Sequence, residues 1–139
     1  RLGCRPRRRV ELVAERSAAL KRQVHDCRLD QVQQGPLWQA ERDCQQALAQ
    51  RLTEQDQRIT DLEAKQGGKP VGPYSRLAKA HRQKESWQRQ LERSRRQEEE
   101  IRVRIGRLQE KIDRLVQEKE KVDAWHAGSM AASGRGIRN

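Results

Sequence analysis

The chain has 139 residues, of which 37% are charged, 33% hydrophobic and 3% aromatic, with no phenylalanine. This composition excludes a thick apolar core, so the chain either buries a narrow apolar stripe or stays disordered until a partner arrives. The net charge of +11 suits nucleic acid, an anionic membrane or an acidic protein as a partner, and no stretch has the roughly 20 apolar residues of a membrane span.

Residues 1–9 are predicted to form a basic disordered tail. The tail holds the cluster Arg5, Arg7, Arg8 and Arg9, and Pro6 could occupy a first helical turn. Such a cluster either docks on phosphate or on an acidic protein, or stays free in solution.

Residues 10–66 are predicted to form the first helical arm. Its heptad stripe advances in alternating steps of three and four residues, a spacing that keeps one helix face towards a partner. Several stripe positions are polar. The stripe consists of Val10, Val13, Ser17, Leu20, Val24, Cys27, Gln31, Gln34, Trp38, Glu41, Gln45, Leu48, Leu52, Gln55, Ile59 and Leu62.

Gly35-Pro36 interrupts this arm, because proline removes one backbone hydrogen bond and collides with the preceding turn. Two interpretations follow. Either the arm is kinked or broken at this point but stays on the same partner, or the chain turns there and forms a three-helix bundle.

Residues 67–73, with the sequence GGKPVGP, are predicted to be a Gly/Pro turn. Residues 74–126 are predicted to form the second helical arm, and residues 127–139 a disordered tail. The second stripe also alternates steps of three and four. It consists of Leu77, Ala80, Lys84, Trp87, Leu91, Ser94, Glu98, Ile101, Ile105, Leu108, Ile112, Leu115, Lys119 and Val122.

The predicted fold is all-α: a long antiparallel coiled-coil helical hairpin that folds back at the turn. In this register large apolar residues meet at most levels, but Glu41 faces Glu98, which is a like-charge clash. The three-helix bundle and a separate parallel dimer are the alternatives. The thin apolar stripe favours further association, either as a homodimer or with a larger protein partner.

No catalytic constellation is present, so we expect a protein that is not an enzyme and has no cofactor and no metal site. The cysteines at positions 4, 27 and 44 are isolated, which indicates reduced thiols and a cytoplasmic protein. Gly67, Gly68 and Lys69 lack the spacing of a phosphate-binding loop. Trp38 and Trp87 lie on the stripes, where packing explains them better than base stacking, whereas Trp125 is off the stripe.

A second basic cluster lies in the second arm and precedes three glutamates. It is either a solvated helix surface or a contact for nucleic acid or an acidic partner. The cluster consists of Arg89, Arg93, Arg95 and Arg96.

The segment GGKPVGPYSRLAKAHRQKESWQRQLERSRRQ resembles the Arg- and Gln-rich coiled-coil insertion of certain transposase-like proteins. The resemblance covers about residues 60–126. It implies a nucleic-acid-associated structural module and carries no catalytic activity, since the chain has no visible DDE-type catalytic domain. By length, basicity and hairpin shape, the chain is also similar to the central stalk proteins of type III secretion and flagellar export. That resemblance implies a subunit that inserts into a hexameric ATPase ring.

Overall fold

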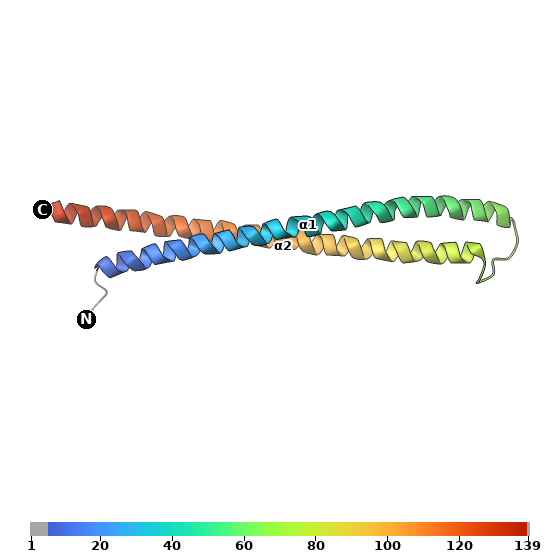
Figure 1. Cartoon of the computed structure of the whole chain (residues 1–139), viewed down its shortest axis with the longest axis horizontal. Helices are drawn as coiled ribbons and strands as arrows, with labels where there is room; N and C mark the ends of the chain where they lie inside the picture. The colour runs from blue at the N-terminus through green and yellow to red at the C-terminus, as the bar shows by residue number, and fades with distance from the viewer. Residues whose placement is uncertain (1–5, 139) are drawn as a thin grey trace. The chain divides into compact units, whose positions relative to one another are not determined.

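The computed structural model describes residues 6–138, and within them the side chains of residues 8–131. The described chain consists of two long helices, α1 (Pro6–Gln66) and α2 (Arg76–Arg138), and of the segment that joins them (Figure 1). The described residues contain no strand, so the all-α class is confirmed.

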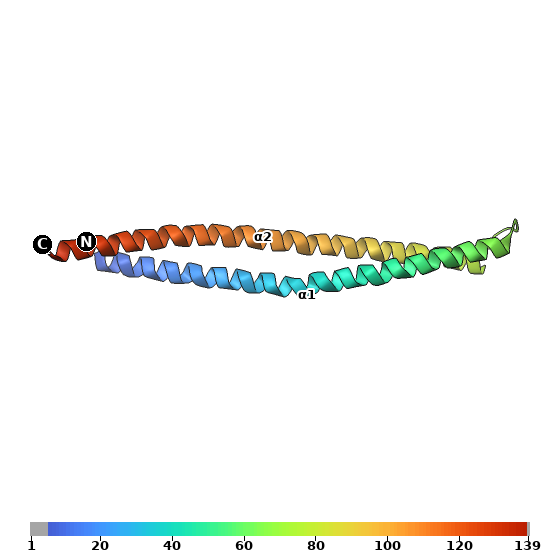
Figure 2. The same ribbon diagram turned by 90° about the horizontal axis from the view of Figure 1, so that it is seen from above.

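Contacts divide the chain into two units. The turn unit is Gln34–Val103, and the end unit combines Arg1–Gln33 with Arg104–Asn139. In each unit a stretch of α1 lies beside an oppositely directed stretch of α2, as the two perpendicular views show (Figures 1 and 2). This antiparallel packing confirms the predicted helical hairpin.

The core of the turn unit is a thin seam between the helices. Ile59 of α1 packs with Leu77 and Ala80 of α2, each 5–6% exposed, and Leu62 covers them. Burial of this narrow stripe must provide most of the stability, because a helix pair has no second layer to cover the outer faces.

The core of the end unit has the same form. Val24 and Cys27 of α1 pack against Ile112 of α2, and Ile112 is only 3% exposed. Leu20, also in this unit, is fully buried. These are stripe positions on both helices, so the heptad pattern selects the buried residues in both units.

The burial pattern follows the predicted stripes closely. Every predicted stripe residue is buried or half-buried. Most large apolar residues off the stripes are exposed, among them Leu12, Leu29, Val32, Leu37 and Val103, whereas Val116 is half-buried and packs on the core of the end unit. The second stripe continues beyond its predicted end at Val122, since His126 and Ser129 follow in the same rhythm and are half-buried.

The predicted break at Gly35-Pro36 is not present, because α1 continues through both residues. Proline costs one hydrogen bond in the helix. Gln34 and Trp38 on either side remain half-buried in the seam, and their packing favours a continuous helix over a turn. The described residues form two helices, so the three-helix bundle is wrong.

The helices extend further than predicted towards the two ends of the chain, whereas α1 ends at Gln66 as predicted and α2 begins at Arg76, two residues later than predicted. α1 begins at Pro6 rather than Val10, with proline in the first position, where its missing N–H is not needed. α2 continues to Arg138, so residues 127–138 are helical where their composition predicted disorder. Adding a residue to an existing helix is much easier than nucleating a new one, and Ala127 and Ala131 favour the extension.

The connection between the helices spans residues 67–75 and is held by side chains of both. Gly67 adopts a positive φ of 61° and its N–H bonds the carbonyl of Glu63 at 3.2 Å, which ends α1. Ser75 caps α2, because its hydroxyl accepts a bond from the N–H of Ala78 at 3.1 Å. Arg82 donates to the carbonyl of Pro73 at 2.8 Å. Within the described part of the chain, neither helix has a segment long and apolar enough to cross a membrane.

Candidate functional site

A buried polar layer interrupts the apolar seam of the turn unit at Glu98. This residue is 7% exposed, and its carboxylate accepts a hydrogen bond from the amide of Gln45 at 2.6 Å. Arg42 lies 3.5 Å and Arg102 3.3 Å from the other carboxylate oxygen. The bond from Gln45 and the two guanidinium groups hold the pKa of Glu98 below its ordinary value, against the opposing effect of burial.

Glu41, which the sequence placed opposite Glu98, has a different partner. The hydroxyl of Ser94 donates to the carboxylate of Glu41 at 2.6 Å. Each glutamate therefore has its own hydrogen-bond donor, which relieves the predicted like-charge clash. Such a layer fits one register of the two helices better than a shifted one, so it specifies the pairing.

Trp38 contacts the same polar layer through Arg42. The guanidinium of Arg42 lies 5.2 Å from the centre of the Trp38 ring. Trp38 is half-buried on the stripe, so packing and a cation–π contact explain it, as the seam position predicted.

One flank of the turn unit has two contacts between a basic side chain of one helix and a carboxylate of the other. Lys84 lies 2.6 Å from Asp56, and His81 lies 3.7 Å from Glu63. In each case α2 supplies the basic group and α1 the acid, next to the seam.

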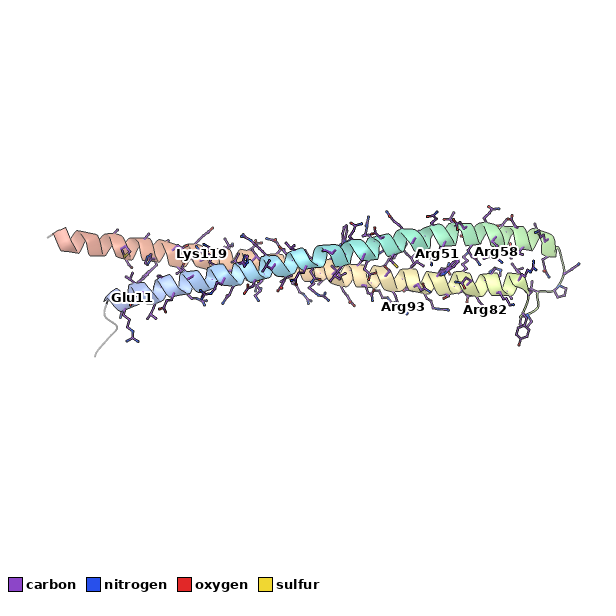
Figure 3. All side chains as sticks on the ribbon, in the orientation of Figure 1. Glu11, Arg51, Arg58, Arg82, Arg93 and Lys119 are labelled. Atoms are coloured by element: carbon purple, nitrogen blue, oxygen red, sulfur yellow. The ribbon has the colours of Figure 1, made fainter. Side chains whose placement is uncertain are left out.

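The opposite flank, here called the basic flank, has no such pairs. Its cations are all exposed, and none of their side chains makes an ion pair or hydrogen bond within the described residues. The basic flank consists of Arg51, Arg58 and Lys65 of α1 and Arg76 and Lys79 of α2. Figure 3 shows Arg51 and Arg58 along one stretch of α1, beside the stretch of α2 that holds Arg82 and Arg93.

The spacing of the sequence produces this flank. Arg51, Arg58 and Lys65 are seven residues apart, so they occupy equivalent positions beside the seam on successive double turns. The equivalent positions of α2 after Arg76 hold Gln83, which is neutral. With no acid across the seam, the charges of α1 remain unpaired.

A groove in the basic flank brings part of this charge together. Three cations from both helices line it with two glutamines, an alanine and a tryptophan, and its lining includes no carboxylate. The lining is Gln55, Arg58, Arg76, Lys79, Ala80, Gln83 and Trp87. The amide of Gln55 is already used, since it donates to the carbonyl of Ala80 at 2.9 Å.

The predicted basic cluster of the second arm shares no residue with the lining of this groove. Arg89, Arg93 and Arg96 line a shallow depression on the outer face of α2 with Glu92, which lies 2.7 Å from Arg96. Arg95 is exposed but does not line it. One of the three arginines is thus already paired.

The predicted cluster at the start of the chain is described only in part. Arg8 and Arg9 are exposed, whereas Arg5 and the side chain of Arg7 lie outside the described residues.

Sequence reasoning missed the basic flank because its cations are dispersed over two helices. The seven-residue spacing of Arg51, Arg58 and Lys65 was the signal that could have found it.

The polar contacts of the end unit include two that join α1 to α2. Asp123 accepts bonds from Lys119 at 2.6 Å and from Ser17 at 2.5 Å, and these bonds lower its pKa. Arg16 pairs with Glu118 at 2.5 Å. Among the described residues, no group of three or more His, Cys, Asp or Glu side chains is placed to hold a metal ion.

Comparison of the chain with family models, with curated proteins and with solved structures gives no match.

Proposed function

We propose that the chain is a non-enzymatic helical-hairpin interaction module whose basic flank binds the phosphate backbone of a nucleic acid. The observation that carries this proposal is the difference between the two flanks of the turn unit. One flank has an ion pair between Lys84 and Asp56 and a contact between His81 and Glu63. On the other flank, the side chains of the five described cations make no ion pair; they are Arg51, Arg58, Lys65, Arg76 and Lys79.

The dimensions of the flank suit a polyanion. From Arg51 to Lys65 the helix rises about 21 Å. A strand of B-form DNA places about six phosphates over that length. Releasing the counterions of those phosphates is the main source of affinity for a surface of this kind. The resemblance to the transposase-like insertion supports the same proposal, because its quoted segment includes Arg76 and Lys79.

We also propose a supercoil of the two helices and a local bend in α1. The heptad spacing of both seams is that of a left-handed supercoil, so we propose that α1 and α2 form a coiled coil. Pro36 cannot donate to the carbonyl of Val32, and Gly35 favours disorder of the backbone, so we propose a local bend of α1 at these residues.

Binding of a labelled duplex of about 20 base pairs tests the function, with fluorescence anisotropy followed from about 50 to 200 mM salt. The variant Arg51→Gln, Arg58→Gln, Lys65→Gln is expected to bind at least about tenfold more weakly at low salt. Its salt slope should be smaller by about 3, because each phosphate contact contributes close to one unit.

A matched control removes the same charge from the end unit: Lys21→Gln, Arg22→Gln, Lys111→Gln. These residues are exposed and make no ion pair in the described chain. The control should retain most of the affinity. Equal losses in both triple variants would mean that only net charge matters and would contradict a specific basic flank.

A second candidate function is that of a stalk subunit in a type III secretion or flagellar export ATPase complex. The two-helix hairpin favours it, since this is the architecture that the resemblance implies. Addition of the purified chain to a hexameric export ATPase should then raise its rate of ATP hydrolysis. An unchanged rate would exclude this candidate and leave the first one standing.

A further inference from the structure

We infer that the groove of the basic flank holds one nucleotide of a single strand, with its phosphate among Arg58, Arg76 and Lys79 and its base against Trp87. This inference rests on the proposed nucleic-acid function and goes beyond it, because it names unpaired strands as the ligand class.

The phosphate end of the groove is defined by charge. Arg58 reaches it from α1, and Arg76 and Lys79 reach it from α2. Three cations held near one space repel each other, and no carboxylate lines the groove. An anion that enters the groove removes this repulsion. A phosphate also offers several oxygens to the forked donors of the two guanidinium groups.

The lining residue of the groove that lies furthest along α2 from Arg76 is aromatic. This residue, Trp87, is half-buried, so part of its indole ring is accessible from the groove. Trp87 is eight residues beyond Lys79, which corresponds to about 12 Å along the helix axis. The long side chains of the cations can reach towards Trp87, so the distance between a bound phosphate and the indole ring is shorter than the distance between the two backbone positions. Gln83 lies midway between them on the same side of α2. Its amide both donates and accepts, so it can bond the edge of a base.

The combination of a cationic end and an aromatic end separates single strands from duplexes. The bases of a duplex are stacked and paired, so only their edges are accessible, whereas an unpaired base can lay its face on an indole ring. A purely electrostatic surface would favour the duplex, because its phosphates are more densely spaced than those of a single strand.

The experiment compares the full chain on two labelled ligands, a thymidine strand of about 20 nucleotides and a mixed-sequence duplex of about 20 base pairs, at the same salt concentration. We expect the single strand to bind at least tenfold more tightly. Trp87→Leu should weaken the single strand about tenfold and leave the duplex unchanged, while Trp87→Phe, which keeps an aromatic ring, should restore most of the affinity. Helical content by circular dichroism identifies any variant that fails to fold.

A charge change inside the groove provides an independent test. Gln83→Glu places a carboxylate next to the three cations and should weaken the single strand at least tenfold. Gln50→Glu makes the same change at an exposed position that does not line the groove, and should have less than a threefold effect.

The outcomes separate the two claims. Equal binding of strand and duplex, or a Trp87→Leu variant with unchanged strand affinity, overturns the nucleotide groove. If the duplex still binds and still responds to loss of Arg51, Arg58 and Lys65, the proposed function survives that result. If neither ligand binds, both claims fail.

Discussion

Gln45 of α1 and Glu98 of α2 are joined across the seam by a hydrogen bond of 2.6 Å, at a position where Glu98 is only 7% exposed. Because Glu98 is an acceptor for Gln45, Arg42 and Arg102, its carboxylate is favoured over the protonated form, and the pKa is lowered from 4.5. The charged state of one side chain is thereby linked to the pairing of the two helices.

This link predicts a loss of stability in acid. A carboxyl whose pKa is lowered by folding stabilises the protein fully above its unfolded pKa, near 4.5 for Glu98, and that stabilisation disappears as the pH falls through the lower folded pKa. Thermal unfolding followed between neutral and acidic pH should therefore show a declining Tm. Glu98→Gln should be less stable at neutral pH and less sensitive to acid. The matched change Glu100→Gln, at an exposed position, should reproduce the wild-type profile, and if Glu98→Gln reproduces it too the link is wrong.

Ile112→Ala is expected to destabilise the end unit. Ile112 is 3% exposed and packs on Val24 and Cys27, so the change both removes apolar burial and leaves a cavity. We expect a loss of about 2–4 kcal/mol in the free energy of unfolding, measured by urea titration. Leu29→Ala, at a position that is 47% exposed, is the control and should cost less than about 0.5 kcal/mol. Similar losses for both would show that the seam is not the core.

The seam was predictable from the sequence because a side-chain pattern with a period of 3.5 residues has one physical use, the burial of a stripe. The ends of the helices and the continuity of α1 at Pro36 were not predictable in the same way. The helix preference of a single residue does not include the packing of its neighbours. A helix that is already packed can tolerate one missing hydrogen bond and can extend through residues 127–138.

The basic flank was harder to predict for a related reason. A contact for nucleic acid or an acidic partner was predicted in the second arm because four arginines are close together in the sequence there: Arg89, Arg93, Arg95 and Arg96. A surface between two helices instead collects residues that are distant in sequence, such as Arg58 and Arg76, and it depends on which acids face them. That information requires the register of the pair, which the sequence pattern leaves open among hairpin, bundle and dimer.

The two described cysteines should differ in reactivity. Cys27 is buried in the end-unit core, whereas Cys44 is exposed. In a Cys4→Ser background, a maleimide reagent should label Cys44 rapidly and Cys27 only after denaturant is added, because a buried thiol is accessible only when the helices separate. Cys44→Ala in the same background is the control, since it leaves Cys27 as the cysteine that can be labelled. Rapid labelling of that variant would contradict the packing of Cys27.

Pro36→Ala should stabilise α1. Pro36 is exposed and lies inside the helix, so an alanine there restores the missing bond to the carbonyl of Val32 without disturbing the seam. The expected gain is up to about 3 kcal/mol in the free energy of unfolding, with higher helical content by circular dichroism. Pro70→Ala, in the connection, gives the opposite expectation, because there proline restricts the unfolded chain. A destabilised Pro36→Ala variant would indicate that the proline has a role beyond the helix backbone.

Gly67→Ala tests how the hairpin reverses direction. Gly67 has a φ of 61°, where a Cβ is strained although the space around it is open, so alanine should cost about 1–2 kcal/mol. The neighbouring change Gly68→Ala is the control: its site is equally open and its φ is not positive, so it should be neutral or slightly stabilising. Gly67→Asn should lie between the two, because asparagine tolerates the left-handed conformation better than alanine does. Urea titration of the three variants separates conformational strain from lost contacts. If Gly67→Ala and Gly68→Ala are equally stable, the positive φ at Gly67 does not determine where α1 ends.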